Sequence, residues 1–139
     1  MLQKRLILVL LAALLIMTGC GGGKYAKEET VLNSLTKAME AFTASINSAD
    51  TPEAVTQALG LFTGTLEKYL PQMKTLAADH ADWETNPPDD LKVTFDKFNS
   101  AKAGFESVMP KLTAMAQDNL GDVDLQNAMN KFISVVKDL

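Results

Sequence analysis

The stretch from residue 52 to residue 79 reads PEAVTQALGLFTGTLEKYLPQMKTLAAD, and its apolar residues recur at alternating steps of three and four. This spacing places them on one face of an α-helix. The apolar residues that follow a heptad through seven members are Val55, Leu59, Phe62, Leu66, Tyr69, Met73 and Leu76. A heptad of this length favours helices that lie side by side and nearly parallel. The stretch therefore predicts a long amphipathic helix that packs against other helices.

Three further segments show the same helical spacing, and no segment alternates with a period of two. They cover residues 31–46, 91–115 and 125–139. Short joints between helices place neighbours antiparallel. The sequence therefore predicts an all-α fold, an up-down-up-down four-helix bundle.

The joints carry residues that begin and end helices. Thr51 and Pro52 suit the cap and the first turn of the second helix. Gly121 is expected to end the third helix in a left-handed conformation, and Asp122 or Asp124 to cap the fourth.

Two prolines lie inside the predicted helices. Pro71 falls in the second helix and Pro110 in the third. Each proline removes one backbone hydrogen bond and clashes with the preceding turn. We therefore expect a kink or a break in both helices.

The first twenty residues have a different character. Lys4 and Arg5 precede an unbroken apolar run from Leu6 to Met17, twelve residues that are too few to cross a hydrocarbon core about 30 Å thick. This pattern is typical of a signal peptide. Cys20 follows and is the only cysteine, so it cannot form a disulfide within the chain.

The residues around Cys20 read IMTGCGGGK from Ile16 to Lys24, and they resemble the lipobox of bacterial lipoproteins. Gly19 and Thr18 match that motif, whereas Met17 stands where it usually has leucine. The resemblance implies that residues 1–19 are removed and that Cys20 carries diacylglycerol and an N-acyl lipid such as palmitate. Gly21 in place of aspartate implies the periplasmic face of the outer membrane.

The sequence therefore predicts three parts of the chain: a signal peptide at residues 1–19, the acylated cysteine and a flexible tether at residues 20–27, and the bundle domain at residues 28–139. Residues 20–139 hold eleven lysines, seventeen acidic residues and no arginine, a formal net charge of −6. The lack of arginine argues against a nucleic-acid partner. An acidic body also repels anionic headgroups, so the tether is expected to hold the protein at the lipid bilayer.

The layout is similar to that of four-helix haem-b cytochromes, including the joint at residues 49–55. That family binds haem through a methionine near the start of helix one and a histidine near the end of helix four. The matching segments, residues 31–35 and 132–136, contain neither residue. We therefore expect no haem and no other cofactor besides the lipid on Cys20.

One loop gathers polar side chains that could bind a divalent cation. Carboxylates and one imidazole are ligands for zinc or manganese. The candidate ligands are Asp79, His80, Asp82 and Glu84. In the alternative interpretation the loop is solvated, Trp83 covers the open end of the core, and His80 is a cation at a helix C-terminus.

The function class follows mainly from what the motifs exclude. No strand-turn-helix elbow, phosphate loop or placed nucleophile is recognisable, so we predict no enzymatic activity. The first hypothesis is a tethered envelope lipoprotein that acts as an interaction or scaffold module for another envelope protein. The alternative is a carrier or sensor of a divalent metal or of a small apolar ligand, the latter in a cavity near the two prolines. The residues predicted to line that cavity are Phe62, Leu66, Phe105 and Met109.

Overall fold

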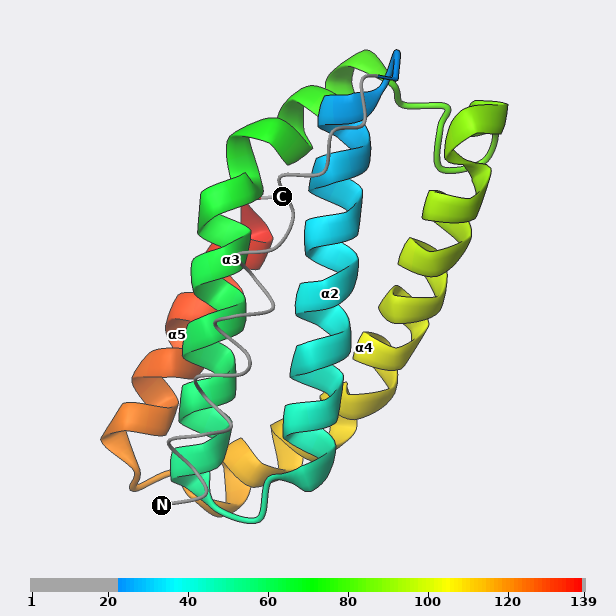
Figure 1. The fold of residues 1–139 in the computed structure, drawn as a ribbon. Helices are drawn as coiled ribbons and strands as arrows, with labels where there is room; N and C mark the ends of the chain where they lie inside the picture. Colours follow the sequence, from blue (N-terminus) through cyan, green and yellow to red (C-terminus); the bar gives the residue numbers. More distant parts are fainter. Residues whose placement is uncertain (1–22, 139) are drawn as a thin grey trace, which may run out of the picture.

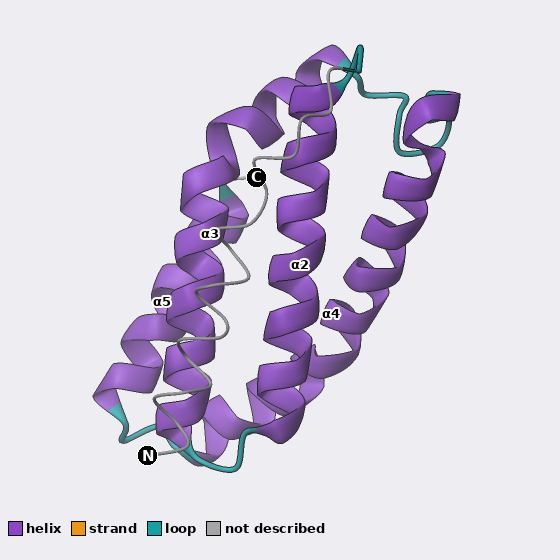
Figure 2. Cartoon of the chain, in the orientation of Figure 1, coloured by secondary structure: helices purple, strands orange, loops and turns teal. Residues whose placement is uncertain are grey.

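A computed structural model describes residues 23–138 of the chain, and this part is helical without strands (Figure 2). The helices are α2 (Ala26–Ser48), α3 (Pro52–Asp79), α4 (Lys92–Asp118) and α5 (Val123–Lys137), and the short 3-10 helix η1 (Asp89–Leu91) precedes α4. The predicted all-α fold with four helices is confirmed. None of the described helices combines the length and the apolar character needed to cross a membrane. The predicted signal peptide and Cys20 lie outside the described residues.

The predicted caps of two helices are present. The Thr51 side chain accepts a hydrogen bond from the Ala54 amide at 3.3 Å, and the Asp122 carboxylate accepts one from the Leu125 amide at 3.0 Å. These bonds satisfy amides that the first turns of α3 and α5 leave free. Residue 26, at the start of α2, lies two residues before the predicted start of the domain.

The expected role of Gly121 is wrong. No glycine in the described part of the chain has a positive φ, and α4 ends at Asp118, three residues before Gly121. The Asn119 side chain donates a hydrogen bond to the Met115 carbonyl oxygen at 2.8 Å. This side chain satisfies one of the carbonyl groups that the end of a helix leaves free, and Asn119 itself has a φ of −124°.

Neither internal proline breaks its helix. α3 continues through Pro71 and α4 continues through Pro110. Both rings are exposed, so the backbone distortion lies on the solvent side. Figure 1 shows that the C-terminal half of α3 bends toward α2. The expected breaks are therefore absent, and α3 bends as a continuous helix.

The helices pack in a different order from their order in the chain. α2 packs extensively against both α3 and α4, and α5 packs against α3, whereas α3 and α4 touch only slightly. The connection between α3 and α4 is the longest of the described joints and crosses one end of the molecule (Figure 1). This connection allows α4 to lie beside α2 instead of beside α3.

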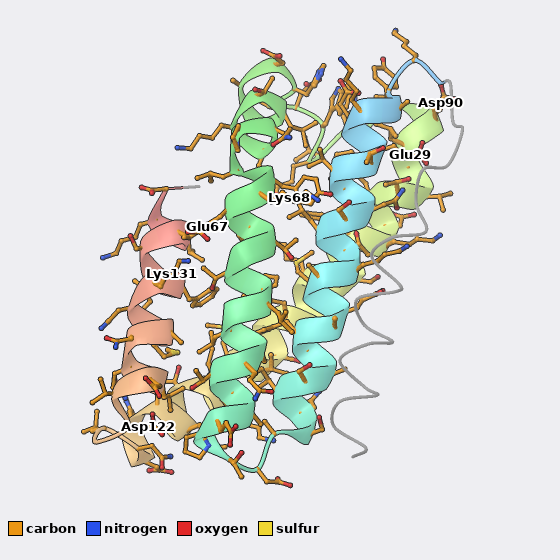
Figure 3. All side chains as sticks on the ribbon, turned by 60° about the vertical axis from the view of Figure 1, so that its left-hand side comes forward. Glu29, Glu67, Lys68, Asp90, Asp122 and Lys131 are labelled. Carbon is orange, nitrogen blue, oxygen red and sulfur yellow. The ribbon has the colours of Figure 1, made fainter. Side chains whose placement is uncertain are left out.

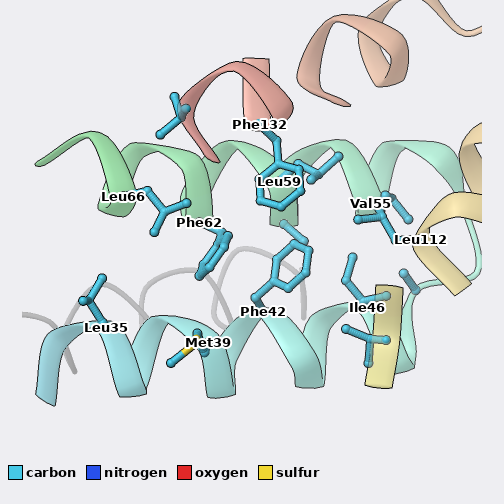
Figure 4. Packing of buried hydrophobic residues seen from close by; sticks show 14 of the residues in the cluster. Leu35, Met39, Phe42, Ile46, Val55, Leu59, Phe62, Leu66, Leu112 and Phe132 are labelled. Atoms are coloured by element: carbon cyan, nitrogen blue, oxygen red, sulfur yellow. The ribbon is translucent and has the colours of Figure 1, made fainter. Parts of the chain in front are cut away.

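One phenylalanine from each helix meets at the middle of the molecule. Phe42 of α2, Phe62 of α3, Phe105 of α4 and Phe132 of α5 form six ring pairs, with centroids 4.8 to 6.4 Å apart. We call these four residues the phenylalanine layer. Figure 4 shows Phe42, Phe62 and Phe132 among the surrounding aliphatic side chains. The layer connects all four helices at one level.

The buried apolar residues form two clusters. The larger one contains the phenylalanine layer and aliphatic residues of all four helices, among them Leu35, Ile46, Leu59, Leu112 and Leu125. The smaller one lies toward the α3–α4 connection and consists of Leu32, Trp83, Leu91 and Phe95. The connection is therefore fixed to the body by its own buried side chains.

We expect Phe62→Ala to lower the free energy of unfolding by about 3–5 kcal/mol, because it removes a buried ring and leaves a cavity. Urea denaturation followed by circular dichroism measures this change. The matched control is Leu61→Ala on the neighbouring residue, which is 53 % exposed and should cost less than about 1 kcal/mol. An equal decrease in the free energy of unfolding for the two variants would contradict a stabilising role of the phenylalanine layer.

A second prediction compares two buried threonines, one with and one without a hydrogen bond from its hydroxyl group. The Thr63 hydroxyl is buried and has no hydrogen-bond partner among the described residues, whereas the Thr36 hydroxyl donates to the Leu32 carbonyl oxygen at 2.8 Å. Thr63→Val removes an unsatisfied group, so it should stabilise the protein by about 1 kcal/mol. Thr36→Val should leave stability unchanged or lower it. Thermal unfolding of both variants tests this, and a destabilised Thr63→Val protein would refute it.

Candidate functional site

α5 does not reach the upper end of the molecule in Figure 1, where the start of α2 and the end of α3 lie. α5 has 15 residues and α3 has 28. Lys131 of α5 pairs with Glu67 of α3 at 3.0 Å, and α5 ends six residues later (Figure 3). The last buried residue of α3 is Leu66. The second half of α3 therefore packs mainly on α2 and keeps one side open.

A groove lies between the start of α2 and the end of α3. It consists of two adjoining hollows of about 400 and 410 Å³, which share Lys27, Val31 and Gln72. We call it the α2–α3 groove. Its lining residues are Ala26, Lys27, Glu28, Thr30, Val31, Tyr69, Pro71, Gln72, Thr75, Leu76, Asp79 and His80.

An aromatic stack closes one end of the α2–α3 groove. The His80 ring lies on the Trp83 ring with centroids 3.6 Å apart and planes at 15°. The Tyr25 ring meets the Trp83 ring edge-on, with centroids 4.9 Å apart. Trp83 is only 8 % exposed and belongs to the smaller apolar cluster. It therefore covers the end of the core, as the alternative interpretation of the loop predicts.

The groove carries charges of both signs. Glu28 and Asp79 line its His80 end, and the Glu28 Oε1 atom lies 4.0 Å from His80 Nε2. Among the described residues, no lysine forms an ion pair with either carboxylate, and Lys27 forms no ion pair. Lys27 and Asp79 are therefore available to an external ligand, and Glu28 has only the His80 ring near it as an ion-pair partner.

Other charges near this end are satisfied within the chain. The Lys92 ammonium donates a hydrogen bond to Asp89, which lowers the pKa of the Asp89 carboxyl and raises the pKa of Lys92. Lys102 pairs with Glu84 at 3.3 Å. Both pairs are exposed and lie outside the α2–α3 groove.

The four residues proposed as metal ligands lie in different surroundings. Asp79 and His80 line the groove, whereas Asp82 and Glu84 are exposed on the connection. Within residues 23–138, no three histidine, cysteine or acidic side chains form a group that could hold a metal ion. The structure therefore does not show the convergence that the metal hypothesis requires.

The four residues predicted to line an apolar cavity belong to the larger core cluster. Phe62 and Phe105 are in ring contact at 5.1 Å, Leu66 is buried, and Met109 is half-buried. None of them lines the α2–α3 groove. The groove begins farther along α3, at Tyr69. In the sequence, Pro71 indicated a local opening in this part of α3. Nothing in the sequence marked the residues of α2 that line the other side of the groove.

No protein-family model, curated protein or solved structure matches the chain. The candidate site therefore rests on its own geometry.

We expect Trp83→Ala to loosen the start of α2, because Trp83 contacts Tyr25 there and packs in the cluster that contains Leu32. Loss of a buried aromatic ring costs about 3–5 kcal/mol in a well-packed core. Hydrogen exchange should become faster in the first turns of α2 than in α5. Glu84→Ala, at an exposed neighbouring position, is the control and should leave both regions unchanged. A uniform increase over the molecule would contradict a local role.

Proposed function

We propose that this protein is a non-enzymatic envelope lipoprotein, anchored through acylated Cys20 at the periplasmic face of the outer membrane. In this proposal the folded domain is an interaction or scaffold module for another envelope protein. A signal-like apolar run, a small residue before Cys20 and the following glycines support the anchor. Several acyl chains on one cysteine give stable anchoring, because one chain alone binds a membrane only marginally.

The observation that carries the module assignment is the filled phenylalanine layer. Four rings in mutual contact occupy the middle of the domain, where a bundle protein would bind a cofactor. The described hollows lie on the surface instead, beside the start of α2. A domain of this kind binds through its outer surface, which suits recognition of a partner better than catalysis.

We also propose that the helices form an up-down-up-down bundle. The ring contact of Phe42 with Phe62 and the approach of Glu28 to His80 support opposite directions for α2 and α3. The hydrogen bonds from Thr94 to Glu29 and from Lys111 to the Asn47 carbonyl support the same direction for α2 and α4. In this arrangement the helices that share a direction lie next to each other, because the long α3–α4 connection crosses the molecule.

A second candidate function is a carrier or sensor of a small ligand. The α2–α3 groove favours this candidate, because its lining combines apolar residues with the acidic Glu28 and Asp79 and the basic Lys27. It favours an apolar or amphiphilic ligand over a divalent metal, since the described acidic side chains form no group suited to a metal ion.

Intact-mass analysis of the full chain purified from membranes tests the anchor. The expected mass is that of residues 20–139 plus a diacylglyceryl group and one N-acyl chain. Cys20→Ser should keep the uncleaved precursor and abolish this added mass, because serine offers no thiol for lipid attachment. Native mass spectrometry of the same sample reports any further ligand. An unmodified Cys20 in mature protein would refute the anchor.

A further inference from the structure

We propose that the α2–α3 groove binds the head of a zwitterionic phospholipid with a primary ammonium, taken from the bilayer that holds the Cys20 anchor. This inference rests on the proposed anchor. It specifies the chemical class of the small ligand proposed above. It also makes the groove the part of the domain that faces the lipid surface. The other faces of the domain then remain available to a protein partner.

The length of the tether places the groove at the membrane surface. Ala26, which lines the first hollow, follows Cys20 by six residues. At 3.3–3.6 Å per residue, even a fully extended tether separates them by no more than about 22 Å. The upper end of the domain therefore stays within reach of the lipid headgroups while Cys20 is anchored.

The charges of the groove fit a primary ammonium next to a phosphate. Among the described residues, neither Glu28 nor Asp79 has a lysine partner, and the Glu28 Oε1 atom lies 4.0 Å from His80 Nε2. A primary ammonium offers three donors to such carboxylates. Lys27, which lines both hollows, can pair with the phosphate. A choline head has no N–H group to donate. An anionic head without an ammonium would face two carboxylates on a body of net charge −6.

The floor of the groove fits the part of the lipid that follows the phosphate. Val31, Leu76 and the Pro71 ring provide apolar surface between the charged residues. The glycerol region and the first methylenes can lie on this floor while the rest of each acyl chain stays in the bilayer.

A basic amphipathic helix of a partner protein would use the same carboxylates and the same floor. The short tether favours the lipid, because it keeps the groove beside a surface where headgroups are always at high local concentration. The experiment below separates the two occupants by using vesicles that contain only lipid and this protein.

The test measures protection of a single thiol in the groove. Thr75 lines the groove and is exposed, and acylation consumes the thiol of Cys20, so Thr75→Cys gives the full acylated chain one reactive cysteine. The protein is placed in vesicles of pure phosphatidylcholine or of phosphatidylcholine with phosphatidylethanolamine. Maleimide addition is followed by intact mass. We expect addition at residue 75 to be at least fivefold slower with the ethanolamine lipid.

Matched variants separate groove binding from a general effect of the membrane. Ser100→Cys, exposed on α4, should react at the same rate in both vesicles. Adding Glu28→Gln to Thr75→Cys should remove the protection, whereas adding Glu40→Gln, exposed on the same helix, should keep it.

Equal rates at residue 75 in both vesicles would overturn the lipid site, as would protection that survives Glu28→Gln. Protection that appears only in membranes containing other proteins would overturn it in favour of a partner helix. Intact mass read before maleimide addition distinguishes these results from failure of the anchor, because a chain without acyl groups refutes the anchor and the lipid site together.

Discussion

The contact of four phenylalanine rings in the phenylalanine layer is the interaction on which the rest of the structure depends. α4 and α5 touch only slightly along their backbones, yet the ring centroids of Phe105 and Phe132 are 6.3 Å apart. Aromatic rings bury large apolar areas and gain further from tilted contacts at these distances. The layer therefore adds side-chain contacts of α4 with α3 and with α5, whose backbones touch α4 only slightly.

The position of this layer along the helices explains the α2–α3 groove. Phe132 lies near the end of α5, whereas Phe62 lies in the first half of α3, so α3 continues for several turns beyond the end of α5. The bend of α3 toward α2 covers part of the side that this leaves open (Figure 1). Small or polar residues such as Ala26, Thr30 and Thr75 line the remaining hollows.

The candidate site could be predicted only in part. His80 and Trp83 stand out in the sequence because each is the only residue of its type, and the structure stacks them at the end of the groove. Their partners Tyr25 and Glu28 lie more than fifty residues earlier and have no local pattern that marks them. The residues predicted to line an apolar cavity belong to or pack on the larger core cluster, because helical spacing identifies core residues such as Phe62 but not how opposing rings are arranged between them.

The sequence by itself determined the four helices, two of their caps and the apolar face of each, because helical periodicity and capping are local properties. It also supplied the signal-like start and the lone Cys20 on which the proposed anchor rests. Only the tertiary structure decided that α4 lies beside α2, that α3 bends without breaking at Pro71, and that a groove opens beside Ala26. These features depend on side chains from distant segments meeting at fixed distances, and packing of that kind has no signature within one segment.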